Sequence, residues 1–179
     1  MAELLEVSQV GNPILRQVAQ PIDRLNEPIQ ALINTLMATL LHSNGVGIAA
    51  PQVAASYRLF IIASRPNLRY PYAPKMEPTV MINPSLISHS EERVKDWEGC
   101  LSVPGIRGLV PRYRTIAVEY CDRQGKLHEQ PLTDFVARIF QHELDHLNGI
   151  VFLDRLETNL EIVTEQEYLK QMAIGHSAD

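Results

Sequence analysis

The sequence predicts an α+β fold organised as a single domain. The chain has 179 residues, enough to bury one substantial hydrophobic core. Several short segments with strand patterns come before one amphipathic helix near the end of the chain, and no internal repeat is visible. Strands that gather ahead of a helix, instead of alternating with helices, favour α+β over α/β architecture. We therefore expect one catalytic domain over residues 1–179.

Hydrophobic spacing predicts one helix early in the chain and one at its end. In residues 28–43, apolar side chains recur every three or four positions, Pro28 suits the first turn, and Gly45 lies just past the end. In residues 160–173, Tyr168 and its apolar neighbours share one face. We expect a long helix in the first segment and a C-terminal helix in the second.

Apolar runs bounded by turn residues predict the strands. They lie at residues 58–64, 79–83, 115–121, 126–132 and 151–153. The third and fourth strands form a hairpin across residues 122–125, and the second ends before Pro84. Residues 65–78 are rich in proline and tyrosine and predict a surface loop between the first two strands.

The composition indicates a protein of a reducing compartment. Apolar residues make up 45% and charged residues 21% of the chain, and the formal net charge of −5 offers no basic surface for DNA. No apolar run approaches the roughly 20 residues of a membrane span, and the acidic N-terminus is unlike a signal or transit peptide. The two cysteines, Cys100 and Cys121, are too few for a disulfide framework. We expect a soluble cytoplasmic protein that binds neither DNA nor membrane.

The most informative motif is HELDH at residues 142–146. His142 and His146 are four positions apart, so on a helix both imidazoles lie on one face and can bind a single metal ion. Glu143 lies beside them, where a carboxylate can move the proton of a water molecule. A solvated helix face that carries two histidines by chance is the alternative. It is disfavoured because residues 133–149 predict an amphipathic helix whose inner face includes both.

A catalytic site of this kind needs a third protein ligand, and the best candidate lies upstream. After His146 the chain offers several carboxylates and only one histidine, His176, near the C-terminus. Cys100 lies in residues 98–105, where small and turn-forming residues predict an irregular segment that can present a thiolate. A lone cysteine is more often a small buried apolar residue, and we prefer that interpretation for Cys121, which ends an alternating strand.

A third informative segment is GVGIAAPQ at residues 45–52. Its glycines and alanines allow the backbone to pass close to another chain, although a helix end with tight packing explains the same residues. It lacks the Lys-Ser/Thr pair of a phosphate loop. Gln52 is polar at the end of an apolar run, so its side-chain amide can donate to an oxyanion.

In this order, GVGIAAPQ at 45–52, EGCLS at 98–102 and QHELDH at 141–146 resemble the three signature motifs of the peptide deformylase family. The resemblance covers about residues 7–156, including NPILR at 12–16. It implies an enzyme that removes the formyl group from the N-terminal formyl-methionine of newly synthesised bacterial polypeptides. It also implies an α+β fold of short, mostly antiparallel strands wrapped around the helix that carries the two histidines.

The resemblance implies a metal site formed by Cys100, His142 and His146. One divalent ion is expected, Fe²⁺ physiologically, with Zn²⁺, Ni²⁺ or Co²⁺ able to occupy the same site. Ligand types alone favour zinc, so the sequence leaves the choice of metal open. A thiolate and two neutral imidazoles leave a divalent ion with a net positive charge, which lowers the pKa of bound water.

The resemblance also implies roles for the remaining site residues. Glu143 would be the general base and acid, and Gln52 and the Leu101 N–H would bind the oxyanion. The backbone of Gly47 would pair with the substrate peptide, and Arg107 would line the substrate cleft. Apolar walls for the methionine side chain are expected from three residues that would serve equally well as plain core: Val46, Phe135 and Ile139.

The tail departs from one family pattern. Some bacterial members dock on the ribosome through a basic C-terminal helix, which makes the ribosome a candidate partner. Here the tail contains one lysine, Lys170, and four acidic residues, namely Glu161, Glu165, Glu167 and Asp179. This balance argues against docking through the tail. Because every implied site residue lies upstream, we expect residues after about 158 to be dispensable for the chemistry.

Two other interpretations fit parts of the sequence. Zinc endopeptidases also carry His-Glu-x-x-His, but no third ligand stands at a suitable downstream position here. A non-catalytic protein with a closed structural site would add Cys121 as a fourth metal ligand. In that case the metal would have no open position, and Glu143 would be dispensable.

Overall fold

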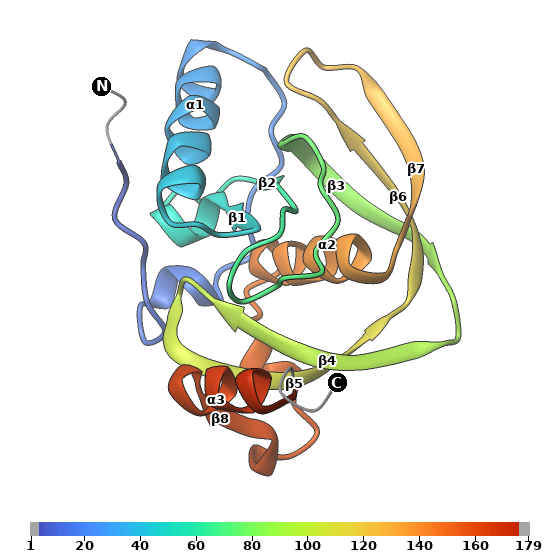
Figure 1. The fold of residues 1–179 in the computed structure, drawn as a ribbon. Helices are drawn as coiled ribbons and strands as arrows, with labels where there is room; N and C mark the ends of the chain where they lie inside the picture. Colours follow the sequence, from blue (N-terminus) through green and yellow to red (C-terminus); the bar gives the residue numbers. More distant parts are fainter. Residues whose placement is uncertain (1–3, 176–179) are drawn as a thin grey trace.

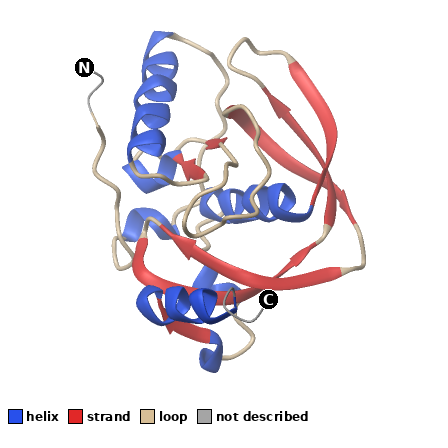
Figure 2. Cartoon of the chain, in the orientation of Figure 1, coloured by secondary structure: helices blue, strands red, loops and turns tan. Residues whose placement is uncertain are grey.

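The structure, a computed structural model, describes residues 4–175, so His176 and Asp179 lie outside it. It combines helices with antiparallel sheets, which confirms the predicted α+β class (Figure 1; Figure 2). The helices are α1 (Glu27–His42), α2 (Asp134–Leu147) and α3 (Glu165–Gly175). The strands are β1 (Gly47–Ala49), β2 (Leu59–Ile62), β3 (Thr79–His89), β4 (Arg93–Cys100), β5 (Val103–Tyr113), β6 (Thr115–Cys121), β7 (Leu127–Thr133) and β8 (Ile162–Thr164). Within residues 4–175 we find no helix with the length and apolar character that a bilayer crossing needs.

The strands form two sheets around α2. The larger sheet has the order β1-β2-β3-β6-β7 and the smaller one β4-β5-β8, with every pair antiparallel. In Figure 1, α2 lies near the centre of the molecule, and the long β4–β5 hairpin passes below it. The helix that carries the histidine motif is therefore enclosed by strands, as the family resemblance implies.

The continuous apolar run of β2 is explained by burial on both faces. Phe60 and Ile62 point into a cluster with the inner face of α2, where the rings of Phe60 and Phe140 meet edge to face with centroids 5.3 Å apart. Leu59 and Ile61 point the opposite way, into the cluster that seats α1. Alternate residues of one short strand thus join both halves of the core.

The strand predicted to stop before Pro84 continues beyond it as β3. Proline has no N–H to give to a neighbouring strand, and the pairing with β6 shifts between Ile82 and Ser85 to leave it out. At this bulge Asn83 adopts a positive φ of 50°. Its side chain accepts from the backbone N–H of Ile22 and donates to its C=O, both at 2.8 Å. The bulge accommodates the proline without ending the strand.

The predicted irregular segment around Cys100 is part of a hairpin, in which the register of the two strands shifts between Glu98 and Cys100. β4 and β5 pair along most of their length and are joined by a two-residue turn at Leu101 and Ser102. Most of β4 is exposed and polar, so hydrophobic alternation does not reveal it. As a result Cys100 is held at the end of a paired strand, opposite Val103.

Two predictions in the C-terminal part need correction. Residues 151–153 form no strand, because the backbone N–H of Val151 donates to the Asp154 carboxylate at 2.9 Å and the chain closes into a 3₁₀ turn. The C-terminal helix begins at Glu165 instead of residue 160, because the preceding residues pair with β5 as β8. This pairing brings α3 to the β4–β5 hairpin.

Candidate active site

The two motif histidines lie on one face of α2. They lie close to Cys100, which is the last residue of β4. His146 is buried, and its Nε2 atom lies 3.2 Å from the Cys100 sulfur. His142 joins them, and one ligand atom from each of the three residues lies within 4.8 Å of the others. One sulfur and two imidazole nitrogens suit a divalent transition metal, and catalytic sites typically use three protein ligands. These residues fit a single divalent ion.

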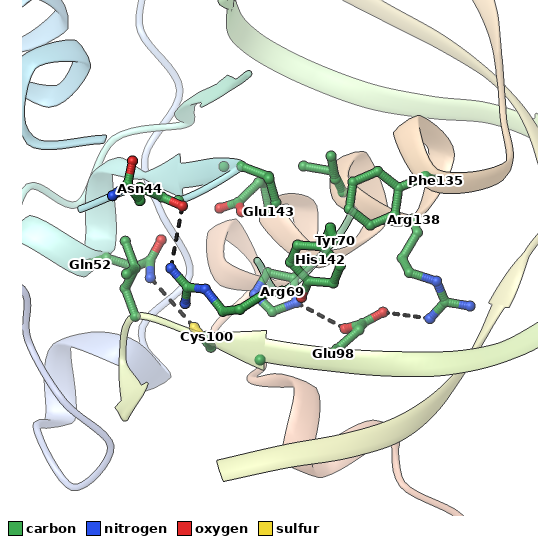
Figure 3. A pocket seen from close by; sticks show the side chains of 16 residues that line it. Asn44, Gln52, Arg69, Tyr70, Glu98, Cys100, Phe135, Arg138, His142 and Glu143 are labelled. Atoms are coloured by element: carbon green, nitrogen blue, oxygen red, sulfur yellow. Dashed lines mark hydrogen bonds and ion pairs between the residues drawn. The ribbon is translucent and has the colours of Figure 1, made fainter. Parts of the chain in front are cut away.

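Glu98 fixes the orientation of His142. Its buried carboxylate accepts from His142 Nδ1 at 2.9 Å, which leaves the other ring nitrogen for the metal (Figure 3). Arg112 holds the carboxylate through two bonds of 2.9 and 3.0 Å, and Arg138 donates to it at 2.8 Å. Burial by itself would raise the pKa of Glu98, but the charge of Arg112 holds it well below its usual value. This role was not predicted, and the only signal for it is the place of Glu98 two residues before Cys100.

The surroundings of Cys100 favour its thiolate. Burial would raise the pKa of the thiol, but the charge of His146, and then contacts with His142, hold it well below its usual value. The backbone N–H of Ser102 donates to the sulfur at 3.4 Å, and the Gln52 amide nitrogen donates at 3.5 Å. The thiolate is the form of cysteine that binds metals.

Glu143 is a buried carboxylate that faces the same cavity. Its side chain lies between Gln52 and His142 (Figure 3). Burial raises the pKa of Glu143 to about 7. Its Oε2 atom has no hydrogen-bond partner among the described residues. Burying a carboxylate costs free energy when one of its oxygens lacks a hydrogen-bond partner, unless a bound molecule supplies that partner. Buried carboxylates with a shifted pKa are common among residues that transfer protons in catalysis.

Gly47 leaves no room for a side chain beside Glu143. A Cβ atom at this position would lie 2.3 Å from Glu143 Oε1. We expect Gly47→Ala to displace that carboxylate and to lower turnover by about 10² or more, since general acid–base catalysis depends on close placement. Metal content should not change, because no metal ligand is touched. The measurement is turnover together with bound metal.

A double variant tests the cause of that loss. Adding Gly47→Ala to Glu143→Gln should cost little further turnover, because both changes disable the same proton carrier. Fully additive losses would contradict this explanation.

The Gln52 side chain has one defined orientation. The backbone N–H of Ala49 can only donate, so the amide oxygen must face it, at 2.8 Å. The amide nitrogen then points to Ser102 Oγ at 3.1 Å and toward the Cys100 sulfur. Leu101 lines the same cavity from the hairpin turn. Both residues thus lie where donors to an oxyanion are needed.

One cavity gathers most of the predicted site residues. Those in its wall are Val46, Gly47, Gln52, Cys100, Leu101, Phe135, Ile139, His142 and Glu143. Seven further lining residues were not predicted as part of the site: Asn44, Gly45, Arg69, Tyr70, Glu98, Gly99 and Arg138 (Figure 3). Arg69 and Tyr70 come from the loop at residues 65–78, whose composition indicates a surface position and carries no signal of the cavity.

Arg107 does not line this cavity, in contrast to the prediction. Its side chain is 1% exposed and lies one layer behind the wall. A Cβ atom on Gly99 would come within 2.8 Å of the Arg107 guanidinium carbon, so the guanidinium fills the space beneath β4. It donates at 2.7 Å to the hydroxyl of Tyr70, which does line the cavity. Arg107 therefore lies behind two residues of the cavity wall, Gly99 and Tyr70.

Cys121 is separate from the metal site. It ends β6 and packs against the cluster that seats α1. Within residues 4–175, the group that can hold a metal consists of Cys100, His142 and His146. The closed structural site with Cys121 as a fourth ligand is therefore wrong.

The fold and the site together define a class of protein. Cys100, His142 and His146 cluster beside a cavity that a buried carboxylate and an oriented amide donor line, next to a helix enclosed by antiparallel strands. This combination is that of a hydrolase with a single catalytic metal.

Comparison with known proteins gives the family. The sequence model described as polypeptide deformylase matches residues 4–161. Peptide deformylase 2 of Nostoc sp. is 64% identical over 167 residues, which cover 93% of this chain and 93% of that protein. Peptide deformylase 2 of Shewanella oneidensis is 45% identical, covering 91% of this chain and 90% of that protein. The chain belongs to the polypeptide deformylase family.

Comparison with solved structures supports the same family assignment. The class I type b peptide deformylase of Acinetobacter baumannii, bound to Met-Ala-Ser, matches with a TM-score of 0.85 at 46% identity, covering 87% of this chain and 100% of that one. The enzyme of Synechococcus elongatus in complex with actinonin matches with a TM-score of 0.78 at 32% identity, covering 90% and 86%. The implied activity is confirmed: the chain is a metal-dependent hydrolase that removes the N-formyl group from newly synthesised polypeptides.

Proposed function

We propose that Cys100, His142 and His146 hold one Fe²⁺ ion and that Glu143 carries the proton during deformylation. The observation that carries this proposal is the Oε2 atom of Glu143, which is buried beside the ligand residues and has no hydrogen-bond partner within residues 4–175. When bound, the metal supplies a Lewis-acid charge that polarises the formyl group and activates water. The remaining steps depend on the side chains around it.

Glu143 moves the proton in both halves of the reaction. The oxygen of water adds to the formyl carbon, and Glu143 takes the proton that the water loses. When the bond between the formyl carbon and the methionine nitrogen breaks, the same carboxyl gives this proton to the leaving amine, and formate departs. A carboxylate oxygen that is not tied to another residue can serve both positions.

Gln52 and Leu101 stabilise the negative charge that builds on the formyl oxygen. The Ala49 N–H turns the Gln52 amide nitrogen toward the cavity, and Leu101 offers a backbone N–H from the hairpin turn. Donors oriented before the reaction are effective because they need no rearrangement as charge develops.

The proposed substrate is an N-formylmethionyl nascent peptide. β1 is an edge strand of the larger sheet, so the backbone at Gly47 can pair with an extended peptide. Val46 and Ile139 then offer apolar walls to the flexible methionine side chain. The Acinetobacter baumannii enzyme binds Met-Ala-Ser, a peptide that begins with methionine, which supports the same assignment here.

We place this reaction in the cytoplasm, where reducing conditions keep the Cys100 sulfur available to the metal. Both cysteines are unpaired. Within the described residues the tail offers one lysine, Lys170, and it pairs with Glu167. The tail therefore lacks the charge for docking on ribosomal RNA, and any ribosome contact would need another surface.

Protein purified without oxygen should release formate from formyl-Met-Ala-Ser and leave the internal bonds of that peptide intact. Turnover should follow the iron content and fall in air as Fe²⁺ oxidises, whereas the Ni²⁺-substituted protein should keep its activity. Internal cleavage without formate would instead indicate an endopeptidase. Turnover that follows zinc and not iron would overturn the choice of metal.

A further inference from the structure

Part of the cavity wall comes from a loop whose outer side chains are exposed. Residues 65–78 place Arg69 and Tyr70 in the wall, where the Tyr70 ring lies 4.8 Å from the ring of Phe135. The neighbouring side chains Leu68 and Tyr72 are 93% and 81% exposed. Within the loop, the Asn67 side chain accepts from the backbone N–H groups of Arg69 and Tyr70, and Arg69 Nη2 donates to the backbone oxygen of Asn44 at 3.3 Å. Further contacts to the same two residues come from the C-terminal part of the chain.

The C-terminal helix adds contacts to this part of the loop. The hydroxyl of Tyr168 in α3 donates to the backbone oxygen of Arg69 at 3.2 Å. The carboxylate of Glu165, the first residue of α3, lies 3.9 Å from Arg69 Nε. Two residues of one helix thus hold the part of the loop that reaches the cavity.

Arg107 joins the same helix to Tyr70. Its guanidinium donates to the Tyr70 hydroxyl at 2.7 Å and to the Glu165 carboxylate at 2.9 Å. The guanidinium carbon lies 5.2 Å from the centre of the Tyr70 ring and 5.1 Å from that of Tyr168. Because Arg107 is buried, Glu165 is the carboxylate that balances its charge, and without it the guanidinium would be drawn away from Tyr70.

We propose that α3 positions the substrate cavity, with Glu165 and Tyr168 as positioning residues that act on Tyr70 through Arg107. The inference rests on the proposed binding of the formyl-methionyl peptide in this cavity. It keeps the expectation that residues after about 158 are dispensable for the chemistry, since Cys100, His142 and His146 all lie upstream, and adds that α3 holds part of the peptide-binding wall. Loss of these contacts should weaken peptide binding without slowing the chemical step.

The test compares Glu165→Gln with Glu167→Gln. Both remove one carboxylate from the same helix, but Glu167 pairs only with Lys170 at the surface. For a formyl-Met peptide we expect Glu165→Gln to raise KM about tenfold with kcat within about twofold of the wild type, and Glu167→Gln to change neither. Tyr168→Phe keeps the ring and loses one hydrogen bond, so a rise in KM of about threefold is expected.

Two further measurements separate positioning from general damage. Trp97, the single tryptophan, lies 5.9 Å from the Tyr168 ring and reports whether α3 stays docked. Its emission should be unchanged in Glu165→Gln and Tyr168→Phe, and metal content should equal that of the wild type. An unchanged KM in both variants would overturn the inference, as would a fall in kcat that accompanies metal loss.

Binding of Met-Ala-Ser keeps this inference distinct from the proposed reaction. Its affinity should fall about tenfold in Glu165→Gln, in parallel with the change in KM. If the wild type bound this peptide but released no formate from its formylated form, the reaction proposal would fail. The affinities of the two glutamate variants would still decide the role of α3.

Discussion

Glu143→Gln is expected to retain the fold and the metal and to lose turnover by about 10²–10⁴-fold. The amide has almost the size of the carboxylate, and Glu143 is not one of the three metal ligands. What disappears is the ability to take a proton from water and to return it to the amine. Metal and oxyanion donors remain, so the variant should bind formyl-Met peptide without converting it.

Metal content, peptide affinity and turnover should be measured on one preparation. Glu129→Gln is a suitable control, because it removes one carboxylate at an exposed position of β7. Metal loss in Glu143→Gln would mean that Glu143 is a ligand. Turnover within a few-fold of the wild type would contradict the assignment of Glu143 as the proton carrier.

Cys100→Ser is expected to abolish activity mainly through the metal. A neutral hydroxyl cannot replace a thiolate as a donor, and the surroundings of Cys100 already favour the thiolate. Without the anionic thiolate, two neutral imidazoles remain as ligands, and they hold a divalent ion less tightly. The net positive charge of the metal site also rises. Both metal content and turnover should therefore fall.

Cys121→Ser is the matched control for this variant. Cys121 lies in β6 against the cluster of α1, so the same chemical change there should leave metal and turnover unaltered. Full metal occupancy and full activity in Cys100→Ser would remove Cys100 from the site. Metal loss in Cys121→Ser would restore the four-ligand alternative.

Most of the chemistry of this site follows from local sequence patterns. The i, i+4 spacing of His142 and His146 needs only a helix to bring both rings to one side, and the amphipathic pattern around them predicts that helix. The class of fold follows in the same way, since the order of strand and helix patterns is a property of the chain. The third ligand was predicted by elimination and by family resemblance, but the paired strand that presents it was not.

Other features depend on residues far apart in the sequence. Glu98 orients His142, which lies 44 positions later in the sequence, and Arg107 donates to Glu165, which lies 58 positions later. Each is a buried charged side chain, and hydrophobic periodicity carries no information on the partner of such a residue. Arg107 was predicted to line the cleft because it matches a family position, and such a match gives no indication of how deeply the side chain is buried.

The sequence by itself determined the fold class and predicted the metal ligands and the proposed proton carrier, because these follow from the order of its elements and from short motifs. Only the tertiary structure decided how the ligands are oriented and what supports the substrate wall. The β4–β5 hairpin brings Glu98 under His142, and the pairing of β8 with β5 brings α3 against the loop that carries Tyr70. These contacts depend on strand pairing between distant segments, whose register is fixed by the whole core and not by the local sequence.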